Sequence, residues 1–161
     1  MSAGAGGNTP TVSRDLDLLA PKFHAAVQAA LDECEAGGLQ AFVYEAFRTL
    51  ELQRLYYARG RTIIPPTRPV TYARTNLESW HGYGLAVDVI HKTKLWDAGD
   101  AWFARVAEIF ERHDCKWGGR WRRADPPHFQ WARCKPSPSD AARLIVRTEG
   151  VAGVWRAVGA D

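Results

Sequence analysis

The stretch SWHGYGLAVDVI (79–90) decides how this chain is expected to fold. Its second half, LAVDVI (85–90), is the short aliphatic run typical of a buried strand. Aspartate is seldom buried unless it is paired or bound to a metal, so Asp88 needs a partner. Two glycines before the strand allow a tight turn that brings His81 back toward Asp88. The stretch therefore predicts either a hydrogen-bonded His–Asp pair or two ligands of a metal site.

A second segment, KWGGRWRRADPPHFQW (116–131), favours the metal site. His128 opens a short predicted strand, and Asp125 precedes it on a loop stiffened by prolines. His81, Asp88 and His128 would form a two-histidine, one-carboxylate set, which in zinc enzymes leaves the fourth tetrahedral position for water. Asp125, close to the metal but not bound to it, would take a proton from that water and pass it to a leaving amine.

Three separated motifs resemble those of the LAS-type zinc peptidases, and the resemblance covers roughly residues 15–132. That family includes D-alanyl-D-alanine carboxypeptidases and dipeptidases, and the L-alanyl-D-glutamate endopeptidases found among phage endolysins. The matching residues are Phe47, Arg48, Thr49 and Gln53 in the first motif, Ser79, His81, Gly84, Ala86 and Asp88 in the second, and Asp125, Pro127, His128 and Phe129 in the third.

The resemblance implies a role for each matching polar residue. One Zn²⁺ per chain would be held by His81, Asp88 and His128, with Asp125 as the general base. Arg48 would bind a substrate carboxylate or the polarised carbonyl oxygen. Gln53 and Ser79 would line the substrate cleft.

The implied activity is hydrolysis of peptidoglycan stem peptides, with the L-alanyl-D-glutamate bond favoured as in endolysins. Two alternatives stay open: a D-alanyl-D-alanine carboxypeptidase or dipeptidase, and a non-catalytic zinc-stabilised module that binds cell-wall peptides. The proton-shuttling Asp125 favours an enzyme over the module. The expected partner is the peptidoglycan peptide, without nucleic acid and without stable membrane insertion, and the chain is expected to be a monomer.

Composition agrees with a single globular domain. The 161 residues are 46% hydrophobic and 24% charged, and no apolar run approaches the roughly 18 residues of a membrane span. The N-terminus lacks the basic and apolar regions of a signal peptide, so we expect synthesis in the cytoplasm and release to the cell wall by a phage holin or a similar route. Arginines cluster in the loop after residue 58 and again at 120–123, which suits an anionic partner.

The order of predicted elements indicates an α+β fold with a small, mostly antiparallel sheet, flanking helices and a zinc cleft. Residues 1–12 are expected to be a disordered tail. Residues 13–161 are expected to form one zinc peptidase domain, with a core at 15–132 and a C-terminal helical extension at 137–159. The predicted helices begin at Pro21, Thr49 and Ala101, two more flank Gly150, and the predicted strands are 39–47, 85–90, 115–117 and 128–131.

Overall fold

The structure, a computed structural model, describes residues 9–161. Most of the predicted tail at 1–12 therefore lies outside the described residues. The helices are α1 (Pro21–Ala36), α2 (Leu50–Ala58), α3 (Asp100–Arg112), α4 (Asp140–Glu149) and α5 (Val151–Ala157), and the strands are β1 (Ala41–Glu45), β2 (Ala86–His91), β3 (Cys115–Trp117) and β4 (His128–Trp131). Four short 3-10 helices complete the set, of which η2 (Asn76–Glu78) and η3 (Trp80–Tyr83) flank the site.

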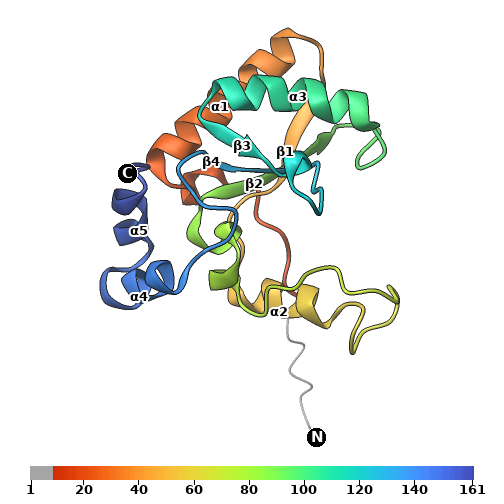
Figure 1. Cartoon of the computed structure of the whole chain (residues 1–161). Helices are drawn as coiled ribbons and strands as arrows, with labels where there is room; N and C mark the ends of the chain where they lie inside the picture. Colours follow the sequence, from red (N-terminus) through yellow and green to blue (C-terminus); the bar gives the residue numbers. More distant parts are fainter. Residues whose placement is uncertain (1–8) are drawn as a thin grey trace, which may run out of the picture.

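The four strands form one antiparallel sheet in the order β1-β2-β4-β3 (Figure 1). The predicted α+β class is confirmed. β2, the strand predicted from LAVDVI, lies inside the sheet between β1 and β4, and four of its first five residues are fully buried. Its central position explains the aliphatic run, because a strand with neighbours on both edges and layers on both faces meets little water.

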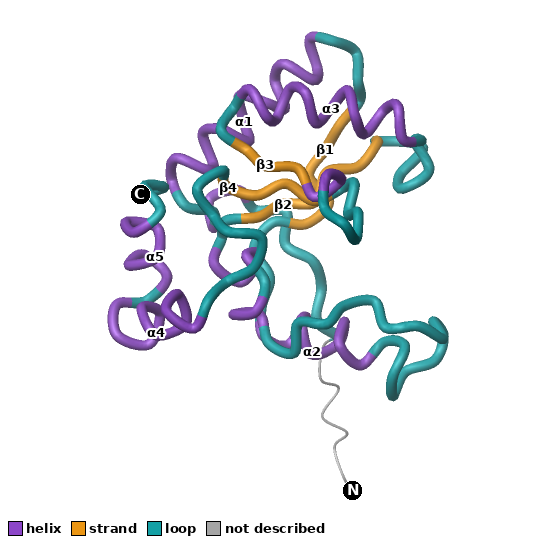
Figure 2. The backbone as a smooth tube through the Cα atoms, viewed as in Figure 1, coloured by secondary structure: helices purple, strands orange, loops and turns teal. Residues whose placement is uncertain are grey.

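Helices α1 and α3 pack side by side on one face of the sheet (Figures 1 and 2). Alternation along β4 turns Phe129 and Trp131 to this face. Phe110 of α3 stacks on Phe129 with ring centroids 4.4 Å apart, and Phe23 of α1 meets Trp131 edge to face at 6.4 Å. The side chains of His128 and Gln130 project from the opposite face of β4, where the polar site lies.

The element boundaries differ from the predicted ones by a few residues. The strand predicted at 39–47 is confined to Ala41–Glu45, because Gln40 has a φ of 53° that no strand accommodates and the chain leaves the sheet at Ala46. The stretch between α2 and η2 contains neither a helix nor a strand of the sheet, as its prolines predict. In Figure 2 this loop extends away from the sheet beside α2.

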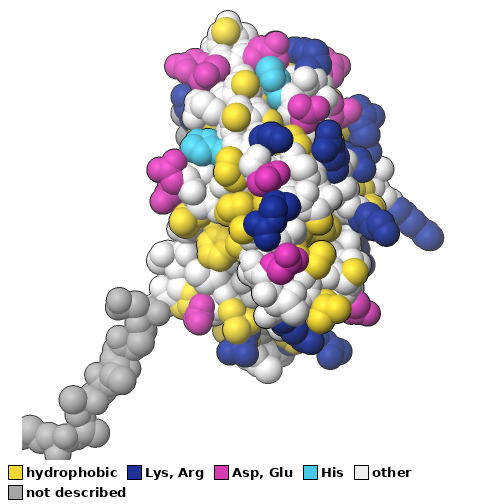
Figure 3. Space-filling model, turned by 90° about the vertical axis from the view of Figure 1, so that its left-hand side faces the viewer, with side chains coloured by type: hydrophobic (Ala, Val, Ile, Leu, Met, Phe, Trp, Pro, Cys, Tyr) yellow, Lys and Arg dark blue, Asp and Glu magenta, His cyan; other side chains and the backbone are white. Residues whose placement is uncertain are grey.

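The two C-terminal helices fall inside the predicted range 137–159 and dock on the rest of the chain. Trp155 of α5 donates its indole N–H to the carbonyl of Tyr83 at 2.6 Å, and Trp131 donates to the carbonyl of Val158 at 2.7 Å. On the face that includes these helices, hydrophobic side chains are visible in the middle of the view, with basic and acidic side chains among and around them (Figure 3). Among residues 9–161, no helix is long and apolar enough to cross a membrane.

Candidate metal centre

Three adjacent strands place three polar residues in a row across the sheet. Asp88 on the central strand β2 pairs with Glu45 of β1 on one side and with His128 of β4 on the other. Paired residues of antiparallel strands project to the same face. The register of the sheet, rather than closeness in sequence, therefore brings His128 beside Asp88.

The short helix η3 delivers the fourth member of the group, His81. Ser79 caps η3 by accepting a hydrogen bond from the His81 N–H, and Gly84 ends it with a φ of 67°, which favours glycine. His81 is nearly fully buried, with its Nε2 3.4 Å from Oδ1 of Asp88. As predicted, the turn brings the side chain of His81 back toward Asp88.

Hydrogen bonds fix both imidazole rings with a lone pair toward Asp88. His81 donates its Nδ1–H to the carbonyl of Ala46 at 2.9 Å, so the lone pair on its Nε2 is available to bind a metal. His128 donates its Nε2–H to Oε1 of Gln130 at 2.8 Å, which leaves its Nδ1 facing Oδ1 of Asp88 at 3.8 Å. The Gln130 amide is itself oriented, because its N–H donates to the carbonyl of Lys135 at 2.9 Å.

The geometry and the charge state of this group both fit zinc. The three ligand atoms lie within 4.8 Å of one another, compared with about 3.3 Å between ligands on a tetrahedral zinc ion. Burial raises the pKa of Asp88, but His81, His128 and Arg48 outweigh it and hold that pKa below its usual value. Burial, and after it the charge of His81, lowers the pKa of His128 to about 4. An ionised carboxylate and a neutral imidazole are the forms that bind a metal.

Asp125 lies at the open edge of this group. Its Oδ2 is 4.0 Å from Nδ1 of His128, and about half of its side chain (51%) is exposed. Gly118 allows this placement, because a Cβ at that position would come within 2.7 Å of the Asp125 carbonyl. Partial burial, and after it the charge of Asp88, raises the pKa of Asp125 to about 6. A carboxyl group with that pKa can both accept and return a proton near neutral pH.

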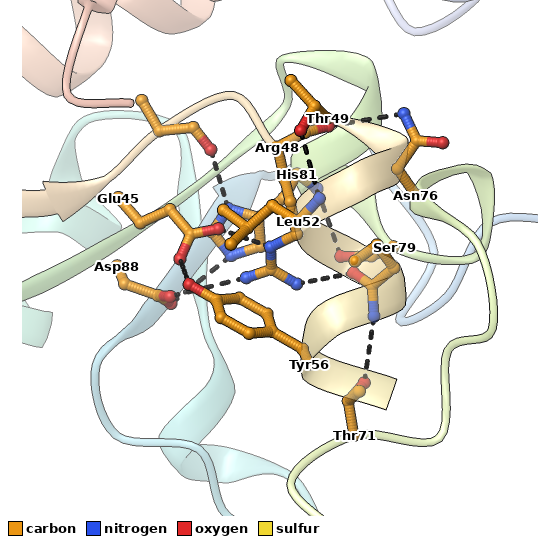
Figure 4. Close-up of polar contacts among 12 residues, drawn as sticks. Glu45, Arg48, Thr49, Leu52, Tyr56, Thr71, Asn76, Ser79, His81 and Asp88 are labelled. Carbon is orange, nitrogen blue, oxygen red and sulfur yellow. Dashed lines mark hydrogen bonds and ion pairs between the residues drawn. The ribbon is translucent and has the colours of Figure 1, made fainter. Parts of the chain in front are cut away.

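Arg48 approaches the centre from the other side and is held from several directions (Figure 4). Its Nε donates to the buried carboxylate of Glu45, and its Nη1 donates to Oε1 of Gln53 at 2.8 Å. Tyr56 lies under the guanidinium and donates its hydroxyl to the other Glu45 oxygen at 2.8 Å. The remaining nitrogen, Nη2, lies 3.9 Å from Oδ2 of Asp88. One edge of the guanidinium is thus aimed at the metal centre.

The structure corrects the position expected for Gln53 and refines that of Ser79. Gln53 is fully buried, and its amide is occupied by Arg48 on one side and by Thr71 and Ala73 on the other, so it does not line a cleft. Ser79 is half-buried and serves as the cap of η3. Gln53 is connected to the centre through Arg48, and Ser79 through the backbone N–H of His81.

Sequence reasoning missed two buried residues that support the centre, Glu45 and Gln130. Each had a signal in the sequence. Glu45 stands three residues before Arg48, and Gln130 stands two residues after His128, on the same face of a predicted strand. The ring of Trp121 lies against His128, with centroids 4.9 Å apart.

Comparison with known proteins places these features in a family. A family model described as D-alanyl-D-alanine carboxypeptidase matches residues 73–131. This range includes His81, Asp88, Asp125 and His128. The chain is 33% identical over 124 residues to the peptidoglycan L-alanyl-D-glutamate endopeptidase CwlK of Bacillus subtilis (strain 168), over 67% of this chain and 72% of that protein. It is 29% identical over 127 residues to the L-alanyl-D-glutamate peptidase of Listeria phage A118, over 73% of this chain and 39% of that protein.

A solved structure has the same fold. The Serratia marcescens L-Ala D-Glu endopeptidase ChiX superposes with a TM-score of 0.50 at 24% identity, over 75% of this chain and 88% of that one. The extent of the match to CwlK agrees with the three motifs that meet around Asp88, and the chain therefore belongs to the LAS-type zinc peptidase family.

Proposed function

We propose that this protein is a zinc-dependent peptidase that cuts the stem peptides of peptidoglycan between L-alanine and D-glutamate. One observation carries the enzymatic part: two imidazole lone pairs and a carboxylate converge at one point, with a half-exposed carboxyl of raised pKa beside them. The preference for this bond is supported by the names of the relatives CwlK and the phage A118 peptidase.

In this proposal His81, Asp88 and His128 hold one zinc ion per chain. When bound, zinc acts as a Lewis acid that makes water nucleophilic at neutral pH. Asp125 takes the proton as the water oxygen attacks the L-alanine carbonyl carbon. It then delivers that proton to the nitrogen of D-glutamate as the carbon–nitrogen bond breaks.

Arg48 is proposed to bind an anionic group of the substrate with the guanidinium edge that faces Asp88. Its other donors are committed to Glu45 and Gln53, so the side chain is oriented before substrate arrives. Replacing it with alanine would leave the buried Glu45 carboxylate without its cation, and breaking a buried pair in this way costs about 3–5 kcal/mol. Arg48→Lys is the better test, because it keeps a positive charge near Glu45 and loses the planar fork.

The bond is identified by mass spectrometry of purified muropeptides after digestion. Products that separate L-alanine from D-glutamate support the endopeptidase. Release of free D-alanine from a pentapeptide stem, with the L-alanyl-D-glutamate bond intact, would instead identify a carboxypeptidase. A protein that retains zinc but hydrolyses no stem peptide would support the alternative of a non-catalytic module that binds cell-wall peptides.

Two further parts of the proposal concern the oligomeric state of the protein and the place where it acts. We propose that it acts as a monomer on the bacterial cell wall after release through a holin or a similar route. The first is tested by light scattering of the zinc-loaded protein. The second is tested by adding the purified protein to intact cells and to isolated walls, where hydrolysis of walls alone would support the need for a release route.

A further inference from the structure

Two loops connected to the metal centre carry arginines that have no carboxylate partner. The loop between α2 and η2 and the loop before β4 supply them: Arg59, Arg61, Arg68, Arg74, Arg122 and Arg123. Within the described part of the chain, the ion pairs formed by arginines involve other residues, and none of these guanidinium groups has a carboxylate within 4.0 Å. Like charges gathered without counter-charge favour binding of an anion.

Tyr72 joins the two loops. The guanidinium carbon of Arg123 lies 4.4 Å from the centroid of the Tyr72 ring, and its Nη2 donates to the Tyr72 hydroxyl at 3.4 Å. The guanidinium carbon of Arg61 lies 5.7 Å from the same centroid. Tyr72 is 61% exposed, so both cations flank a surface that substrate can reach. We refer to Arg61, Tyr72 and Arg123 as the Tyr72 cluster.

Arg61 is held rigidly inside this cluster. Its Nη1 donates to the carbonyls of Tyr57 at 2.7 Å and Thr71 at 3.0 Å, and its guanidinium stacks over the Tyr57 ring at 3.7 Å. These contacts leave its Nε and Nη2 donors for a ligand. A guanidinium fixed in this way loses little rotamer entropy on binding, and its planar fork matches a carboxylate.

The Tyr72 cluster is tied to the metal centre from both sides. On one side, Thr71 and Ala73 accept hydrogen bonds from the Gln53 amide, whose oxygen receives Arg48. On the other side, Arg123 stands two residues before Asp125 in the same loop. The cluster is therefore placed to contact the same substrate molecule as the metal centre, at some distance from the scissile bond.

We propose that the Tyr72 cluster binds a carboxylate of the stem peptide that lies beyond D-glutamate, on the leaving side of the scissile bond. The inference rests on the proposed peptidase function. With Arg48 committed to one anionic group close to the bond, the cluster supplies a second anchor, and two anchors set the register of the peptide over the metal centre.

The test uses two synthetic stem peptides that both contain the L-alanyl-D-glutamate bond. One ends in a free carboxylate downstream of D-glutamate, and its twin carries an amide there. Arg123→Gln is the main variant because the side chain is on an exposed loop and its described contacts are with Tyr72 alone. The matched control is Arg105→Gln, which removes one positive charge from the exposed face of α3.

For the free-carboxylate peptide, Arg123→Gln should raise KM by about 5- to 10-fold with little change in kcat, as expected for a partly exposed charge-assisted contact. For the amidated twin the same variant should change KM by about twofold at most, and Arg105→Gln should match wild type on both peptides. Arg123→Lys should recover part of the loss, since it restores charge but not the fork.

Equal changes on both peptides, or no change on either, would overturn the inference while leaving the proposed function intact. A zinc-loaded wild type that cuts neither peptide between L-alanine and D-glutamate would overturn the proposed function, and the inference with it. Zinc content and circular dichroism of each variant establish that the comparison is made between folded, loaded proteins.

Discussion

Replacing Gln130 with leucine should weaken zinc binding although Gln130 is not one of the three proposed ligands. In the present structure Gln130 accepts the Nε2–H of His128 and thereby leaves the lone pair on Nδ1 facing Asp88. Without that acceptor, the metal-free ring can take the other tautomer and donate Nδ1–H to Asp88. Zinc binding then forces the proton back to Nε2, where leucine offers no partner.

The size of the effect follows from the burial of His128. A buried donor left without a partner costs about 1–3 kcal/mol, and that cost falls on the zinc-loaded state. It corresponds to a loss of about 5- to 150-fold in affinity, which includes the range of about 10- to 100-fold seen when a partner of a metal-bound histidine is removed. The fold should survive, because the Lys135 carbonyl that Gln130 also contacts receives a second hydrogen bond from Trp80 at 2.7 Å.

The assay is competition with a chelator of known zinc affinity at fixed pH. Gln130→Glu is the matched control, since its carboxylate still accepts the Nε2–H and should keep zinc binding at least as tight as in wild type. The reasoning is refuted if Gln130→Leu, folded by circular dichroism, binds zinc as tightly as wild type. It is equally refuted if both variants lose the same affinity.

The remaining predictions concern the ligands, the base and its titration. His81→Ala, Asp88→Ala and His128→Ala should each lose zinc on dialysis, and full zinc by elemental analysis in all three would contradict the ligand assignment. Asp125→Asn should keep zinc but lose about 10²- to 10⁴-fold in kcat, and near-normal hydrolysis would remove Asp125 from the mechanism. In metal-free protein the pKa of Asp125 should be about 6 by carboxyl NMR and should fall in Asp88→Asn; a wild-type midpoint near 4 would contradict this. Because this pKa is raised above its unfolded value, Asp125 stabilises the metal-free fold below about pH 4, and that contribution is lost as the pH rises through 6.

The sequence was sufficient for those parts of the site that depend on local pattern. Alternation in 85–90 and in 128–131 gives the strands and the faces of Asp88 and His128, and glycines beside His81 give the turn. Each of these depends on residues within a few positions of one another. The same is true of the start of α2: Thr49, where that helix was predicted to begin, caps it by accepting a hydrogen bond from the Leu52 N–H.

The burial of an individual side chain could not be predicted from local pattern. Gln53 belongs to a motif that suggested contact with substrate, yet residues 71–73 lie over it and take its amide hydrogens. Whether a loop about 20 residues downstream covers a side chain is decided by tertiary packing, which no local period encodes. Motif resemblance thus identified a residue that hydrogen-bonds to Arg48 but predicted it to be more exposed than it is.

Glu45 shows why strand register was beyond reach. Val43 pairs with Val89, so regular alternation would set Tyr44 opposite Asp88, and Glu45 opposite Val87 on the apolar face. A bulge between Val43 and Glu45 instead sets Glu45 opposite Asp88. This one-residue shift carries the carboxylate to the face of the metal centre, where Arg48 can reach it.

The bulge also changes the electrostatic account of the buried aspartate. The side chain of Asp88 is 16% exposed, and it does not face a metal alone: Glu45 brings a buried carboxylate to the same face, and Arg48 lies between the two. With both imidazoles neutral, as metal binding requires, the two carboxylates and one guanidinium leave one negative charge uncompensated. Arg48 hydrogen-bonds directly to Glu45 but is 3.9 Å from Asp88, so the uncompensated charge resides mainly on Asp88. A divalent cation at the converging lone pairs would neutralise that charge and the charge of ionised Asp125, and once Asp125 has taken a proton it would leave a net positive charge facing the scissile carbonyl, where negative charge develops during hydrolysis.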